Sequence, residues 1–100
     1  MKEKELILKL SKFGEFLSTR FLGKLVREKM EKVWNGYEII YIDASGVEGM
    51  TNSFADECFG KLLQEKGISQ FKEKLRFQNL NKFSEKVLIK ALSNRLPTID

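Results

Sequence analysis

Histidine is absent from this 100-residue sequence, which also has only one cysteine and one proline. Without histidine, Ser–His and Cys–His nucleophile pairs and the usual zinc and haem ligand sets are excluded. One cysteine cannot form an internal disulfide bond. The longest apolar runs have about four residues, too short for a membrane span or a secretory signal. These absences predict a cytoplasmic protein that binds no cofactor or metal and is not an enzyme.

The apolar residues are sufficient for one packed core. They make up 42% of the chain and include eight phenylalanines and one tryptophan. Disordered chains are poor in aromatic residues, so this composition indicates a folded chain. The length is that of one small domain. We therefore predict a single domain over residues 1–100, with a core from about residue 5 to residue 95.

Charge is distributed unevenly along the chain. Residues 1–36 and 68–100 each carry a net charge of +4, whereas residues 37–67 carry −4. One interpretation is a small basic accessory protein that contacts nucleic acid through Lys/Arg-rich helix faces. Nucleic-acid binders usually concentrate basic residues on one element, and here the acidic middle of the chain contains the most unusual loop. The pattern therefore favours a protein partner over nucleic acid.

Hydrophobic periodicity predicts strands and helices in alternation. Tyr37–Ile42 is β-branched and nearly continuously apolar, as is typical of a central parallel strand buried on both faces. The resulting fold class is α/β, a mostly parallel sheet packed with about three to four helices. The predicted elements are strands at Lys4–Leu10, Tyr37–Ile42 and Leu75–Gln78, helices from Ser18 or Thr19 to Gly36, from Phe54 to Gly67 and from Asn81 or Ser84 to near Pro97, and a short helical segment at Ile68–Lys74.

Several positions within the predicted helices have specific expectations. Phe21 and Leu25 fall on the apolar stripe of the first helix, and Phe83 falls on that of the last. Cys58 lies on the stripe of the second helix and is expected in the core. Glycine inside a helix costs about 1 kcal/mol relative to alanine. Close approach of helix to sheet would explain two such glycines, Gly23 and Gly60.

The segment from Asp43 to Glu57 resembles a known loop. A strand ends at Asp43, Gly46-Val47 follows, and Phe54–Glu57 reads Phe-Ala-Asp-Glu. This segment resembles the loop between a central strand and a helix in STAS domains, the fold of anti-sigma factor antagonists. It is most similar to a bacterial STAS-like family of unknown function. That family also favours a Ser-Arg pair opening its first helix and an asparagine after the third strand, which here correspond to Ser18, Arg20 and Asn79.

The resemblance implies a non-catalytic regulatory domain that binds a protein through residues 48–57. The implied partner is an ATP-binding histidine-kinase-like or anti-sigma-type protein. In the antagonists a kinase phosphorylates a serine of this loop, but the corresponding position here is Asn52, so Ser53 is the only phosphorylation candidate. The expected partner-binding residues are Glu48, Thr51, Asn52, Ser53, Asp56, Glu57 and Arg20.

Local structure offers another explanation for this cluster. Asn52 and Ser53 are good N-cap residues, and Asp56, three residues after Ser53, resembles a capping box with a shorter acid. Arg20 is unfavourable at a helix start unless a carboxylate faces it, and Asp56 or Asp43 could do so.

Other ligands fit the loop poorly. The spacing of Asp43, Glu48, Asp56 and Glu57 matches no EF-hand loop. The Gly46-x-x-Gly49 sequence lacks the Gly-Lys-Thr ending of a phosphate-binding loop. We therefore expect neither nucleotide nor divalent metal to bind.

Overall fold

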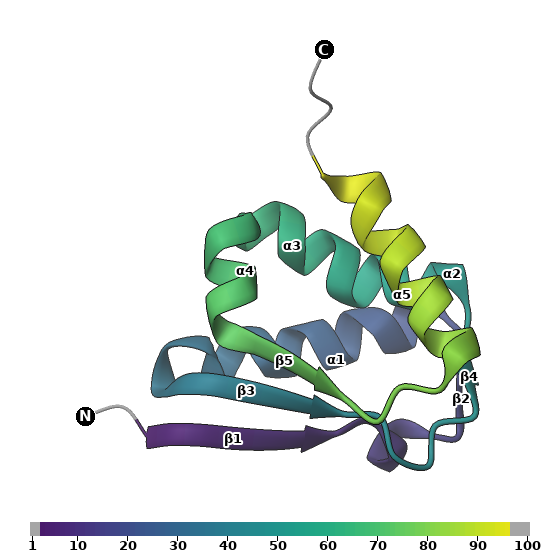
Figure 1. Cartoon of the computed structure of the whole chain (residues 1–100), viewed down its shortest axis with the longest axis horizontal. Helices are drawn as coiled ribbons and strands as arrows, with labels where there is room; N and C mark the ends of the chain where they lie inside the picture. The colour runs from purple at the N-terminus through teal and green to yellow at the C-terminus, as the bar shows by residue number, and fades with distance from the viewer. Residues whose placement is uncertain (1–2, 97–100) are drawn as a thin grey trace.

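Three parallel strands form the main sheet of the computed structural model, which describes residues 3–96 (Figure 1). They are β1 (Glu3–Lys9), β3 (Tyr37–Asp43) and β5 (Leu75–Gln78), in the order β1-β3-β5. Each flanking strand pairs with β3 in parallel. The prediction that Tyr37–Ile42 is the central parallel strand is therefore confirmed.

The helices cover one face of this sheet. Ile40 and Ile42 of β3 are fully buried, whereas Ile39 and Tyr41, which point the opposite way, are only half-buried. The prediction that this strand is buried on both faces is wrong. The strand order advances in one direction, so two crossovers of the same hand place their helices on the same side. The helices are α1 (Arg20–Val33), α2 (Asn52–Ala55), α3 (Lys61–Lys66), α4 (Ile68–Lys74) and α5 (Lys82–Arg95).

A continuous helix from residue 52 to residue 66 lies between α1 and α5. It consists of α2, a π-helical segment at Asp56–Gly60, and α3. The residues of the π-helical segment that follow Asp56 are all buried, including Cys58, whose predicted core position is confirmed. π-Bulges are rare and often mark functional or tightly constrained positions.

A second, very small sheet joins two segments that are distant in the sequence. Its parallel strands are β2 (Phe16–Leu17) and β4 (Gly49–Met50). The amide of Glu48 donates to the carbonyl of Glu15 at 2.8 Å, and the amide of Thr51 donates to that of Leu17 at 3.0 Å. The sequence predicts only a loop over residues 43–53, because a two-residue strand is too short to show periodicity. This pairing holds the loop against the N-terminal part of the chain.

The predicted helix caps are partly correct. Thr19 caps α1 and Asn81 caps α5, as two of the expected alternatives. The prediction that Asn52 or Ser53 caps the second helix is wrong, because the side chain of Thr51 accepts from the Phe54 amide at 3.1 Å. Thr51 has the extended backbone that an N-cap needs, whereas Asn52 and Ser53 are already helical.

The apolar stripes are narrower than predicted, and the helical glycines face other helices. The side chains of Phe21 and Phe83 are mostly exposed, and Leu25 is also exposed.

A Cβ at Gly23 would lie 2.8 Å from the Phe54 carbonyl oxygen, and one at Gly60 would lie 3.1 Å from Arg95 Cγ. The close approach is therefore between helices, not between helix and sheet. Three packed helices leave no room for a side chain at these crossings.

Candidate partner-binding cleft

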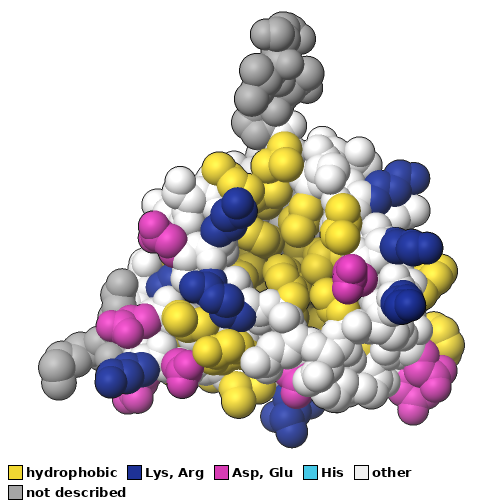
Figure 2. Space-filling view, in the orientation of Figure 1, with side chains coloured by type: hydrophobic (Ala, Val, Ile, Leu, Met, Phe, Trp, Pro, Cys, Tyr) yellow, Lys and Arg dark blue, Asp and Glu magenta, His cyan; other side chains and the backbone are white. Residues whose placement is uncertain are grey.

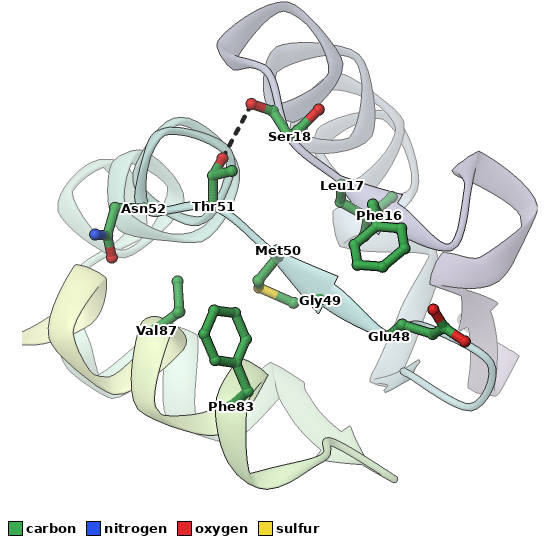
Figure 3. Close-up of a pocket in the computed structure, with 10 residues that line it drawn as sticks. All are labelled: Phe16, Leu17, Ser18, Glu48, Gly49, Met50, Thr51, Asn52, Phe83 and Val87. Carbon is green, nitrogen blue, oxygen red and sulfur yellow. Dashed lines mark hydrogen bonds between the residues drawn. The ribbon is translucent and has the colours of Figure 1, made fainter.

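An apolar cleft of about 590 Å³ lies between the small sheet and α5 (Figure 3). The aromatic rings of Phe16 and Phe83 lie on either side of β4. A Cβ at Gly49 would lie 3.4 Å from Phe16 Cδ1 and 3.6 Å from Phe83 Cε1, so both rings reach the backbone of Gly49. Phe16 is 65% exposed and Phe83 is 62% exposed. The lining residues are Phe16, Leu17, Ser18, Glu48, Gly49, Met50, Thr51, Asn52, Phe83 and Val87.

Three of the residues predicted to bind a partner line this cleft: Glu48, Thr51 and Asn52. The Glu48 carboxylate points away from the two rings in Figure 3. The Thr51 hydroxyl donates to the Ser18 carbonyl at 3.0 Å while it caps the following helix. Asn81 donates to the Glu48 carbonyl at 2.9 Å, which attaches the loop to the start of α5. The rim of the cleft is thus held by hydrogen bonds from two directions.

Ser53 is exposed in the first turn of the helix that follows the cleft, beside the lining residue Asn52. Whether it is a phosphorylation site stays a prediction. Thr51 is less suited to that role than Ser53, because its hydroxyl is engaged with the backbone on both sides.

The other predicted residues form an ion-pair cluster outside the cleft. Arg20 donates to Asp56 at 3.0 Å and to Glu57 at 3.3 Å, so its expected pairing with Asp56 is confirmed. The alternative pairing of Arg20 with Asp43 is wrong. Asp56 also accepts two hydrogen bonds from Arg95, each 2.7 Å long. It does not form the capping box suggested for it, because Thr51 and not Ser53 caps this helix. The hydrogen bonds from Arg95, with the one from Arg20, lower the pKa of Asp56 to about 2.

Glu57 is buried, and three cationic side chains lie against it. Arg27 donates to its carboxylate at 2.8 Å and to its backbone carbonyl at 2.9 Å, and Lys61 lies 3.0 Å away. Burial raises the pKa of Glu57, but the hydrogen bonds from Lys61, Arg27 and Arg20 outweigh it, and the pKa is lowered. The π-helical segment places both acids of the Phe-Ala-Asp-Glu motif against arginines of neighbouring helices. In this structure the two acids therefore hold helices together.

Asp43 and Asn79 meet at the carboxyl ends of β3 and β5. The Asn79 amide donates to Asp43 at 2.9 Å, and Ser45 donates to the same oxygen from its amide and its hydroxyl. The hydrogen bond from Asn79, followed by those from Ser45, lowers the pKa of Asp43 to about 2. Asn79 has φ +60°, which asparagine tolerates better than most residues. This motif residue thus closes the turn after β5.

Residues 3–96 contain no group of three or more His, Cys, Asp or Glu side chains that could hold a metal ion. In the glycine loop, Gly46 has φ +82°, and a Cβ there would lie 3.3 Å from Ser11 Cβ. This glycine therefore serves a tight turn against a neighbouring segment. That the protein binds no nucleotide stays a prediction.

Sequence reasoning missed Phe16, Phe83 and Val87 as cleft residues. Phe83 and Val87 are one helical turn apart, and Phe83 was expected on the apolar stripe of the last helix. The sequence offers no signal that Phe83 is exposed, because the neighbouring polar residue, Ser84, is itself fully buried. Arg27 and Arg95 were also missed as partners of the acids, since no local pattern links residues 30 to 39 positions apart.

The fold and cleft define a small α/β domain with a parallel sheet, helices on one face and an apolar recess beside a strand–loop–helix segment. The family model of the STAS-like domain of unknown function (DUF4325) matches residues 22–85. This match covers more than half of the chain, so the chain belongs to that family. No curated protein and no solved structure matches it. In the described part of the chain, no helix combines the length and apolarity needed to cross a membrane.

Proposed function

We propose that this domain is a non-catalytic regulatory module that binds a partner protein through the cleft and the loop at residues 48–57. The observation that carries the proposal is the pair of exposed rings, Phe16 and Phe83, on either side of Gly49. Exposed apolar patches of this kind commonly mark protein-binding sites, and aromatic residues dominate the binding energy of such sites. The predicted residues Glu48, Thr51 and Asn52 line the same recess.

The ion-pair cluster supports this function indirectly. Asp56 and Glu57 bind Arg20 and Arg27 of α1 and Arg95 of α5, which fixes the helix that follows the cleft. A preformed surface loses less entropy on binding than a mobile one. We assign contact with the partner first to the exposed residues Glu48, Thr51, Asn52 and Ser53, and the positioning of that surface to Arg20, Asp56 and Glu57.

The STAS resemblance suggests the kind of partner. An ATP-binding histidine-kinase-like or anti-sigma-type protein is the natural counterpart in related antagonists. Because Asn52 occupies the position of the phosphorylated serine, regulation by phosphate would have to use Ser53. Binding itself does not depend on that modification.

The test is quantitative affinity capture from the native host with wild-type protein and with the double variant Phe16→Ala/Phe83→Ala. Both rings are mostly exposed, so the fold should tolerate their removal. Phe21→Ala is the matched control, because Phe21 is 74% exposed and does not line the cleft. We expect a partner that is retained by wild type and by Phe21→Ala but lost by the double variant. Equal retention by all three proteins would contradict the proposal.

A further inference from the structure

A row of lysines runs along α5 beside the cleft. Lys82, Lys86 and Lys90 are spaced four residues apart, so they lie on one side of the helix over about 12 Å. Phe83 and Val87, which line the cleft, form the adjacent row. Figure 2 shows basic side chains along the outer edge of α5. The apolar recess and the basic row are therefore neighbouring parts of one surface.

The fold itself makes little use of these lysines. All three are exposed, and within residues 3–96 no carboxylate forms an ion pair with any of them. Lys82 is also the first residue of α5, where the helix dipole disfavours positive charge. The partly buried Arg27 and Arg95, in contrast, both have carboxylate partners. Uncompensated charge beside an apolar recess is what complementarity to a charged partner requires.

We propose that this surface binds a segment of the partner protein in which one or two bulky apolar side chains enter the cleft and acidic side chains face Lys82, Lys86 and Lys90. This inference rests on the proposed function and specifies the chemistry of the partner. About two turns of helix would match the length of the lysine row. The apolar anchor provides most of the affinity, and the acids provide orientation and selectivity.

The cleft is less suited to nucleic acid. Its only charged lining residue is the acidic Glu48, and its walls include the aliphatic side chains of Leu17, Met50 and Val87. A phosphate backbone that followed the lysine row would meet Glu48 where a basic contact is needed. An acidic peptide can instead place an apolar side chain in the recess and keep its carboxylates on the side of α5.

The experiment selects binders to the whole 100-residue chain from a random-peptide display library. The strongest peptides are then labelled with fluorescein, and their dissociation constants are measured by anisotropy. One variant is Lys82→Glu/Lys86→Glu/Lys90→Glu, and its matched control is Lys24→Glu/Lys29→Glu/Lys32→Glu, which reverses three exposed charges on α1. We expect the selected peptides to be rich in Asp, Glu, Leu and Phe. Charge reversal on α5 should raise the dissociation constants of these peptides about tenfold or more, and charge reversal on α1 should raise them much less.

The outcomes separate the two proposals. Peptides that need Phe16 and Phe83 but bind equally well after charge reversal on α5 would overturn this inference and leave the proposed function standing. Peptides that bind Phe16→Ala/Phe83→Ala as tightly as wild type, or no enrichment at all, would contradict both. Saturable binding of fluorescein-labelled oligo(dT) that competes with the peptides would instead assign the surface to nucleic acid. A dimer in sedimentation that Phe83→Ala dissociates would assign it to a second copy of the chain.

Discussion

Asp56 receives hydrogen bonds from two arginines that lie at opposite ends of the chain. Arg20 begins α1 and Arg95 ends α5, so a single carboxylate connects three helices. Only about a fifth of the Asp56 side chain is exposed, which limits screening of these pairs by water. Charge-assisted, bidentate geometry of the kind made by Arg95 is the strongest form of this interaction. At the scale of single residues, the loss of this carboxylate should therefore weaken the contacts among all three helices.

Asp56→Asn should lower the free energy of unfolding by about 1–3 kcal/mol, because Arg95 loses its carboxylate partner and Arg20 keeps only Glu57. The measurement is urea denaturation followed by circular dichroism. Glu48→Gln is the control, since Glu48 is exposed and none of its side-chain contacts is an ion pair within residues 3–96. If Asp56→Asn lowers the free energy of unfolding no more than the control does, solvent screens the ion pairs of Asp56.

Ser53→Asp should leave the melting temperature nearly unchanged and alter affinity for the partner. Ser53 is exposed in the first turn of its helix, where the dipole favours negative charge. The added charge lies beside Asn52 of the cleft, so it should weaken binding of an acidic segment. Melting curves and peptide anisotropy measure the two effects. An unfolded variant would mean that the hydroxyl is structural, and unchanged affinity would place the interface elsewhere.

At the scale of helices and strands, the crossing of α1 with the continuous helix at residues 52–66 determines where the acids lie. Gly23 is buried at this crossing, next to the Phe54 carbonyl and Glu57 Cβ. The lack of a side chain lets Arg20 and Arg27, before and after Gly23 on α1, reach across to the π-helical segment. The close contact at Gly23, the π-helical segment and the ion pairs therefore depend on one another.

Gly23→Ala should destabilise the protein by about 1–3 kcal/mol, although alanine is the better helix former. The new Cβ would lie 2.8 Å from a backbone oxygen and force the helices apart. Gly36→Ala is the matched control, because a Cβ at Gly36 would have no heavy atom within 4 Å. Thermal unfolding of both variants is the measurement. A melting temperature for Gly23→Ala at or above that of wild type would show that the crossing is loosely packed.

At the scale of the whole molecule, the lowered pKa values make stability depend on acid pH. The pKa values of Asp43 and Asp56 are both about 2, and that of Glu57 is also lowered. Between these values and the ordinary carboxyl range, the unfolded chain binds more protons than the native protein. The contribution of these carboxyl groups to the free energy of unfolding is therefore complete above about pH 5 and is lost as the pH decreases toward 2. Glu31, whose pKa is raised by burial and by Glu65, contributes in the opposite sense.

We expect the melting temperature to be nearly constant above about pH 5 and to fall steadily from about pH 4 to pH 2. Asp56→Asn removes one of the lowered carboxyl groups, so its melting temperature should fall less over that interval. Circular dichroism melts across this pH range, for wild type and variant, provide the comparison. Parallel curves for the two proteins would mean that Asp56 keeps an ordinary pKa.

Local patterns in the sequence determined most of the secondary structure. The apolar run at Tyr37–Ile42, the periodic residues of the helices, and the caps at Thr19 and Asn81 each depend on residues close together in the chain. The Phe-Ala-Asp-Glu motif and its surroundings were enough to indicate the family. The pairing of Arg20 with Asp56 was also predictable, because a cation at a helix start requires a compensating charge.

Only the tertiary structure decided how the site is assembled. Phe16 lies beside Gly49 because β2 and β4 pair through backbone hydrogen bonds, which do not depend on side-chain type and leave no periodic pattern. Phe83 approaches Gly49 from α5, whose start is attached to the same loop by Asn81. Asp56 meets Arg95 because α5 crosses the helix at residues 52–66, and nothing local to either residue specifies that crossing. Tertiary packing also explains why some residues of the predicted apolar stripes are exposed. The neighbouring elements determine which part of each stripe is buried. Exposure of Phe83 is therefore a property of the assembled molecule, whereas the helix that contains it is a property of the chain.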